Sequence, residues 1–276
     1  MMMKPKEAEL PRQIVTMLPK LDPALAKYGL DNHVARVALM LDISGSMDHL
    51  YSSGKVQRTV DQAVALGYRF DDNAAIDLFA FGQSAYHFGE VTTENFGTVL
   101  KDLLKKHRLE GGTRYDRAIA CLRNYYFGFE GVMNVPYKPD AKPPVYCIFV
   151  TDGDTQYKEQ AVAQIQSASF APMFIQFIAI GANFFPNEHV KEVPPQKKGF
   201  LGSLLGSTDN DPCPREFRFL HKLDAEVPGR YVDNANFFSI NSPDTIEPEK
   251  LFELMMSEYP QWLELDQVKA MLGRER

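Results

Sequence analysis

Short runs of apolar residues recur along the chain, and most of them end in polar turns. Such runs are typical of strands that are buried on both faces of a parallel sheet. A strictly alternating pattern would instead indicate a strand with one face in water. Strands are predicted over Val34–Leu41, Ala74–Phe81, Ala85–Phe88, Val145–Val150, Met173–Ile180 and Phe237–Ile240.

Between the strands, apolar residues recur at the spacing of amphipathic helices. Because strands alternate with helices, the sequence predicts an α/β fold. Its central sheet is doubly wound and mainly parallel, with right-handed crossovers. Helices are predicted over Pro11–Tyr28, Lys55–Phe70, Thr93–Lys106, Arg114–Tyr126, Gln156–Ser167, Phe217–Leu223, Glu249–Tyr259 and Trp262–Arg276.

The pattern divides the chain into two parts. Residues 1–33 are predicted to form an N-terminal helical extension, and residues 34–276 one α/β domain that ends in helices. A stretch near 187–214 is rich in Pro, Gly, Ser and Lys, and we interpret it as a surface insertion of that domain. Unstructured loops of this length are uncommon inside domains.

Composition excludes several classes of protein. The net charge of −6 disfavours a nucleic-acid partner, since such proteins cluster Lys and Arg. The N-terminus has no apolar signal-peptide core, and no stretch reaches the ~20 apolar residues of a membrane span. We therefore expect a cytoplasmic protein. Three widely spaced cysteines indicate neither a disulfide framework nor a zinc site.

Side chains that carry oxygen cluster in three predicted loops. Asp42, Ser44 and Ser46 follow the first strand, Thr113 follows two glycines, and Asp152 follows the strongest strand. Ligands of open α/β sheets bind at the carboxyl ends of the strands, so these loops should meet there. The alternate spacing of the first three lets a tight turn direct them to one point. Oxygen ligands with few carboxylates suit Mg²⁺, with Mn²⁺ or Ca²⁺ as alternatives.

Each of these residues has a plainer interpretation. Asp42 or Thr113 would also serve as an ordinary helix cap, although capping does not require five residues to converge. Asp48, His49 and Asp154 lie near the loops and are interpreted as surface residues. Two tyrosines, Tyr51 and Tyr157, are candidates for the rim of the site.

The five residues resemble the metal-ion-dependent adhesion site of von Willebrand factor A (vWA) domains in order and strand context. The resemblance implies that Ser44, Ser46 and Thr113 touch the metal directly. It places Asp42 and Asp152 at or just behind that first layer of ligands. With only two carboxylates the cation stays electrophilic, so an acidic group of a protein partner is expected to complete its coordination.

The resemblance covers about Ala35 to Ile240. Residues 37–72 and 228–238 are also similar to a bacterial branch of these domains, the TerF-like group associated with tellurium resistance and chemical stress. This likeness implies a cytoplasmic bacterial protein that works with other members of a stress-response system. Taken with the adhesion-site resemblance, it leads us to expect a Mg²⁺-dependent binding module that is not an enzyme.

Two other functions stay open. A metal-dependent phosphohydrolase would use an Asp at a strand end beside Mg²⁺ as nucleophile. Phosphatases of the haloacid-dehalogenase type, however, need a second Asp where Ser44 stands. The other alternative is a structural scaffold whose site stays empty in the cell. Nucleotide binding is disfavoured, because neither a G-x-G-x-x-G nor a Walker-type loop is present.

Overall fold

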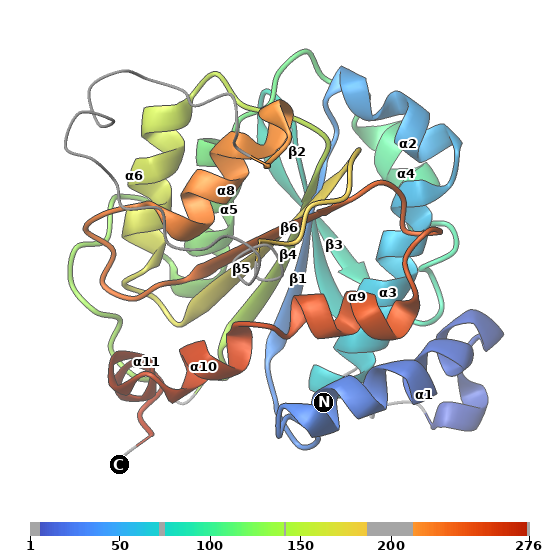
Figure 1. Cartoon of the computed structure of the whole chain (residues 1–276), viewed down its shortest axis with the longest axis horizontal. Helices are drawn as coiled ribbons and strands as arrows, with labels where there is room; N and C mark the ends of the chain where they lie inside the picture. The colour runs from blue at the N-terminus through green and yellow to red at the C-terminus, as the bar shows by residue number, and fades with distance from the viewer. Residues whose placement is uncertain (1–5, 72–74, 141, 187–211, 275–276) are drawn as a thin grey trace.

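A six-stranded sheet runs through the centre of the protein, in the order β3-β2-β1-β4-β5-β6 (Figure 1). The computed structural model describes residues 6–71, 75–140, 142–186 and 212–274. In this part of the chain only β3 runs antiparallel to its neighbour, β2, so the predicted mainly parallel α/β sheet is confirmed. The strands are β1 (Arg36–Asp42), β2 (Ile76–Phe81), β3 (Ala85–Val91), β4 (Val145–Thr151), β5 (Met173–Ile180) and β6 (Ala235–Ile240).

Helices flank the sheet on both faces. Among the helices of the described residues, α1 and α3 are the longest, with 16 residues each. The helices are α1 (Arg12–Lys27), α2 (Asp48–Ser52), α3 (Lys55–Phe70), α4 (Val99–Lys106), α5 (Tyr115–Phe127), α6 (Lys158–Ala168), α8 (Arg218–Ala225), α9 (Pro248–Met255), α10 (Tyr259–Glu264) and α11 (Asp266–Met271). Short 3-10 turns lie at Glu7–Glu9, Gly45–Met47 and Arg215–Phe217.

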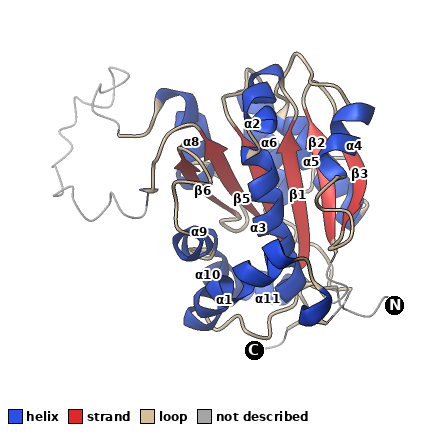
Figure 2. Cartoon of the chain, turned by 90° about the vertical axis from the view of Figure 1, so that its right-hand side faces the viewer, coloured by secondary structure: helices blue, strands red, loops and turns tan. Residues whose placement is uncertain are grey.

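Alternate residues of β1 bury their side chains in two different cores. Leu39 and Leu41 pack on the face that carries α1, α3, α4 and α9. Ala38 and Met40 pack on the face that carries α5, α6 and α8. Both cores are apolar, which explains why the sequence of this strand is a continuous apolar run. In Figure 2 the strand β1 rises from α1, at its amino end, towards α2, at its carboxyl end.

The pairing of β1 with β4 places two of the predicted site loops together. Leu41 lies opposite Val150, so the strands end side by side, at Asp42 and Thr151. Because parallel strands share a direction, the loops that follow them leave the sheet at the same edge. Register alone therefore brings the first and third predicted loops within reach of each other.

The N-terminal helix α1 is part of the packing of the sheet. It contacts α3 and α9, and Ile14, Leu18 and Leu21 are buried in the same core as α3. The C-terminal helices α9, α10 and α11 contribute to that core as well. Most of the predicted insertion, 187–211, lies outside the described residues. Within the described ranges, no helix has both the length and the apolar character that crossing a membrane requires.

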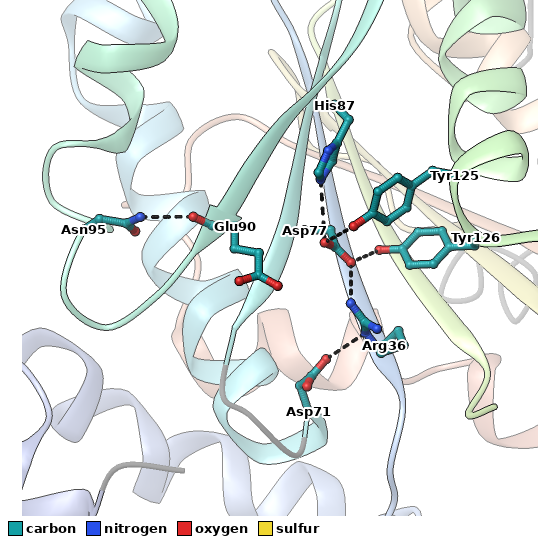
Figure 3. Close-up of polar contacts among 8 residues, drawn as sticks. All are labelled: Arg36, Asp71, Asp77, His87, Glu90, Asn95, Tyr125 and Tyr126. Atoms are coloured by element: carbon teal, nitrogen blue, oxygen red, sulfur yellow. Dashed lines mark hydrogen bonds and ion pairs between the residues drawn. The ribbon is translucent and has the colours of Figure 1, made fainter. Parts of the chain in front are cut away.

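Predicted helix boundaries were wrong in two regions of the chain, for local reasons. The helix predicted from Thr93 begins only at Val99. The side-chain amide of Asn95 instead donates to the backbone carbonyl of Glu90 at 3.0 Å (Figure 3). Its Oδ1 accepts the backbone N–H of Thr92 at 2.9 Å, and both bonds compete with helix formation.

The second region is at the C-terminal end. The helix predicted over Glu249–Tyr259 ends at Met255, and a new helix, α10, starts at Tyr259. The single helix predicted over Trp262–Arg276 was also wrong: the extended backbone of Leu265 separates α10 from α11, which ends at Met271. Pro260 lies in the first turn of α10, where its missing N–H costs nothing. In the middle of a continuous helix the same ring would clash with the carbonyl four residues earlier.

A buried carboxylate near the amino end of β2 ties three elements together. Asp77 is 1% exposed and accepts hydrogen bonds from Tyr125 and Tyr126 of α5, at 2.9 and 2.6 Å (Figure 3). Arg36 of β1 donates to it at 2.9 Å and also forms an ion pair of 3.3 Å with Asp71. This cluster lies at the end of β1 and β2 opposite to the predicted site.

Candidate metal-binding site

The last residue of β1, Asp42, is fully buried and has a partner on each carboxylate oxygen. Its Oδ1 accepts the backbone N–H of Ser44 at 2.7 Å, and its Oδ2 accepts the hydroxyl of Thr151 at 2.6 Å. Burial raises the pKa of Asp42 to about 7, although these hydrogen bonds act in the opposite direction. Asp42 therefore orients the loop that follows it and lies behind the surface of the site.

The hydroxyls of the β1 loop connect to the β4 loop through one chain of contacts. Ser44 Oγ lies 3.2 Å from Ser46 Oγ, and Ser46 Oγ donates to Asp152 Oδ1 at 2.8 Å. Burial raises the pKa of Asp152, and the bond from Ser46 opposes that shift. Two hydroxyls and one carboxylate from separate loops thus meet at the carboxyl edge of the sheet.

Thr113 reaches the site from the second predicted loop. It lines the same cavity of about 370 Å³ as Ser44 and Ser46. Its backbone carbonyl accepts the hydroxyl of Thr155 at 2.6 Å, which fixes the loop before α5 to the loop after β4. The structure therefore brings all five predicted residues together, four through direct hydrogen bonds or contacts and Thr113 through the shared cavity.

Glu110 holds the loop of Thr113 against the loop after β1. Its backbone N–H donates to the carbonyl of Ile43 at 2.8 Å, and its carbonyl accepts the N–H of Gly45 at 2.9 Å. Its side chain accepts Ser84 N–H at 3.0 Å and the hydroxyl of Tyr86 at 2.7 Å. Sequence reasoning missed this residue, since nothing in a Glu-Gly-Gly turn indicates bonds to two other segments of the chain.

Thr151 and Tyr115 support the site from below. The Tyr115 hydroxyl lies 3.2 Å from Thr151 Oγ1 and donates to the carbonyl of Gly153. Both residues are fully buried. One signal was available in the sequence: a hydroxyl at the end of a buried strand requires a hydrogen-bond partner. Asp42, at the end of the neighbouring strand, is that partner.

The two tyrosines predicted at the rim have different positions. Tyr157 lines the cavity, with the guanidinium carbon of Arg114 3.6 Å from the centre of its ring. Tyr51 is instead packed against the core, and its hydroxyl donates to the carbonyl of Asp42 at 2.8 Å. Tyr157 is therefore a rim residue, while Tyr51 supports the end of β1.

The surroundings of the predicted surface residues are also defined. His49 Nδ1 lies 2.8 Å from the carbonyl of Ser46. Asp154 lines the cavity and forms an ion pair of 2.5 Å with Lys158. The negative charge of Asp154 is thus partly balanced at the edge of the site.

The donor set fits a hard cation. Its members are three hydroxyls and two carboxylates, and ions such as Mg²⁺ prefer oxygen ligands. In the described part of the chain, no three His, Cys, Asp or Glu side chains form a cluster able to hold a metal. Any metal bound here would therefore depend on the neutral hydroxyls as much as on the carboxylates.

Comparison with known proteins gives a match over most of the chain. Residues 34–187 and 206–272 match the family described as vWA-TerF-like, a vWA found in the TerF C terminus. A protein of Bacillus subtilis (strain 168), "Uncharacterized protein YcbR", is 29% identical over 255 residues. The aligned region covers 91% of this chain and 86% of that protein.

Solved structures with a similar shape have low sequence identity. Proximal thread matrix protein 1 from the mussel byssus is 17% identical and covers 82% of this chain and 48% of its own, with a TM-score of 0.49. A form of it described with a zinc-occupied MIDAS motif is 18% identical, covers 54% and 39%, and scores 0.42. The ArnB paralog VWA2 from Sulfolobus acidocaldarius is 17% identical, covers 54% and 35%, and scores 0.35. The chain spans about half or less of each, and none of these similarities transfers a ligand or partner to it.

Proposed function

Since the chain belongs to the vWA-TerF-like family, we propose that it is a binding module that holds a divalent cation between Ser44, Ser46 and Thr113. The observation that carries this proposal is the contact chain from Ser44 through Ser46 to Asp152, beside the cavity that Thr113 also lines. Mg²⁺ is the expected ion because the donors are all oxygen. Asp42 and Asp152 lie behind the hydroxyls and orient them.

The charge of the site favours an anionic partner. The three proposed direct ligands are neutral, and Asp42 already has both oxygens in hydrogen bonds. A divalent cation on such ligands keeps most of its charge and attracts a further oxygen anion. We propose that a carboxylate of a protein partner supplies it, in the cavity of about 370 Å³ beside Ser44 and Thr113.

Binding, rather than catalysis, is the role that the site supports. A phosphohydrolase would need Asp42 as nucleophile, with a carboxylate oxygen free to attack. That side chain is 0% exposed, and the Ser44 N–H and the Thr151 hydroxyl occupy its two oxygens. We expect no Mg²⁺-dependent hydrolysis across a panel of phosphate monoesters. Turnover that disappears in Asp42→Asn would overturn this part of the proposal.

The family match also motivates a proposal for the cellular role. We propose that the partners are other proteins of a bacterial tellurium-resistance or chemical-stress system and that the protein acts in the cytoplasm. The match to a vWA described from TerF supports this assignment. The test is affinity capture from tellurite-stressed cells, with and without chelator. Capture of stress-system proteins that EDTA abolishes is expected, and an EDTA-insensitive or empty set would contradict it.

Calorimetric titration with MgCl₂ tests the metal site directly. We expect one Mg²⁺ to bind the wild-type chain, and Ser46→Ala and Thr113→Val to weaken binding by about tenfold or more, a loss of about 1.4 kcal/mol for each tenfold. Thr16→Val is the matched control, since Thr16 is an exposed hydroxyl residue on α1. At 100 times its dissociation constant, Mg²⁺ should also stabilise the fold by about 2.7 kcal/mol.

Two results would contradict the proposal of a metal site. Wild-type protein that shows no heat of binding and no thermal shift at millimolar Mg²⁺, Mn²⁺ or Ca²⁺ would support the empty scaffold instead. Equal affinities in the wild type, Ser46→Ala and Thr113→Val would place any bound ion elsewhere.

A further inference from the structure

A groove of about 530 Å³ lies between α6 and α8, on the sheet face that also carries α5. Its floor is apolar and is formed by Val162, Phe219, Val227 and Pro228. Figure 1 shows these two helices side by side, and they are in contact. Concave apolar sites of this size are typical binding sites in proteins.

The rim of the groove is mainly basic. Lys158, Arg218 and Lys222 line it, against the single acidic residue Glu159. Lys158 extends over the ring of Phe219, with its ammonium 5.3 Å from the ring centre. Lys222 is exposed and has no ion pair with the residues that the structure describes. An apolar floor with a cationic rim favours a ligand that is apolar at its centre and acidic at its edges.

From this arrangement we infer that the groove docks an acidic segment of a protein partner. The segment inserts an apolar side chain between α6 and α8 and places carboxylates against Lys158, Arg218 and Lys222. Charge complementarity identifies this occupant: the rim carries three basic residues and one acidic residue, and Lys222 has no ion pair among the described residues, so a basic ligand would be repelled there. A nucleic acid would leave the apolar floor unused. A few desolvated apolar anchors typically carry most of the affinity at such surfaces.

This surface is distinct from the candidate metal site but adjoins it. Lys158 lines the groove, and its ion-pair partner Asp154 lines the metal-site cavity. A segment that occupies the groove does not need a metal ion in order to bind. The two sites are therefore separable by experiment.

The test selects displayed random short peptides on the full chain, in the presence of EDTA. The enriched peptides are then synthesised with a fluorophore and titrated by fluorescence anisotropy. We expect them to combine an aromatic or aliphatic residue with acidic neighbours. Lys222→Glu should weaken their binding by about tenfold, whereas Lys105→Glu, an exposed lysine of α4 on the opposite face, should leave it unchanged.

A second variant tests the apolar floor of the groove instead of its basic rim. Val162→Glu places a carboxylate on the apolar floor, and its melting temperature shows whether the chain stays folded. Loss of peptide binding in both Val162→Glu and Lys222→Glu is the expected result. No enrichment, enriched peptides without acidic residues, or affinities unchanged in both variants would overturn the inference. Binding that Ser46→Ala abolishes would locate the peptide at the metal site and would overturn it too.

Discussion

The hydroxyl of Ser46 donates a hydrogen bond of 2.8 Å to the carboxylate of Asp152, a residue 106 positions further along the chain. The pairing of β1 with β4 makes this contact possible, because Leu41 and Val150 are in register just before the two loops. The geometry of the site therefore depends on the sheet, and changes to the sheet core near these loops should alter cation binding.

Thr151→Val tests the support beneath the site. Valine has nearly the same shape as threonine, but it cannot donate to Asp42 Oδ2, which the native hydroxyl reaches at 2.6 Å. A buried carboxylate that loses a donor costs about 1–3 kcal/mol, so the free energy of unfolding should fall by that amount. Urea denaturation measures the loss, with Thr16→Val as the exposed control. A Thr151→Val protein as stable as the wild type would contradict the role assigned to this hydroxyl.

Asp77→Asn tests the cluster at the other end of the sheet (Figure 3). The carboxylate accepts from Tyr125, Tyr126 and Arg36, and an amide would place its own N–H groups against some of these donors. We expect a loss of about 2–3 kcal/mol in the free energy of unfolding, below the range for a fully buried ion pair because Arg36 is 38% exposed.

The cation site provides the control for Asp77→Asn. Because the cluster lies at the opposite end of the strands, Mg²⁺ affinity should stay that of the wild type. If Asp77→Asn and the wild type were equally stable in urea, the donors Arg36, Tyr125 and Tyr126 would be hydrogen-bonded to water in the variant.

His33 should make stability depend on pH in the acid range. Its ring packs against Phe70 and Tyr259, and burial lowers its pKa from 6.5 to about 4. Between these values the unfolded chain holds a proton that the folded protein lacks. The stability that the neutral ring contributes is thus complete above about pH 6.5 and is lost as the pH falls towards 4.

The measurement compares urea unfolding of wild type and His33→Gln across this range. The wild-type slope should exceed that of the variant by up to about 1.4 kcal/mol per pH unit. Identical slopes in the two proteins would assign the acid sensitivity to other groups.

Gly67→Ala in α3 should increase helix propensity but should also crowd the core beside the helix. Alanine is favoured over glycine inside a helix by about 1 kcal/mol. A Cβ at this position, however, would lie 2.1 Å from Cγ2 of the buried residue Ile76 on β2. β-branched side chains are stiff, and overpacking costs about 1–3 kcal/mol, so we expect net destabilisation. In Gly67→Ala/Ile76→Ala the first substitution should become neutral or favourable in thermal unfolding.

Gly97→Ala is the matched control for that experiment. A Cβ at Gly97 meets nothing within 4 Å, so its effect should stay within about 0.5 kcal/mol. Stabilisation by Gly67→Ala alone would mean that α3 shifts away from β2 at little cost.

The sequence predicted the features of the structure that depend on the residues of a single strand or a single loop. Continuous apolar runs predicted the parallel strands, and polar residues directly after them predicted the Asp42, Ser44, Ser46 and Asp152 positions. Because parallel strands end at the same edge, these residues had to come close. The short helix α2, Asp48–Ser52, was not predicted, since five residues are too few to show a period.

Contacts between segments that are far apart in the sequence could not be predicted from the sequence pattern. The backbone of Glu110 pairs with the loop after β1, and its side chain bonds the hairpin between β2 and β3. No periodicity encodes such a relationship, because it depends on register and side-chain direction in the folded state. Thr151 was overlooked for a related reason: its role depends on Asp42 being opposite it in the neighbouring strand.

The strand order also has a consequence for synthesis on the ribosome. When residues 1–140 have emerged, β1, β2 and β3 are complete, but the edge of β1 that pairs with β4 has no partner. That edge presents unpaired backbone N–H and C=O groups on a strand whose side chains are mostly apolar, and such unpaired edges promote aggregation. We expect nascent chains that stall in the connection before Val145 to require chaperone protection, and release from it to coincide with the arrival of β4.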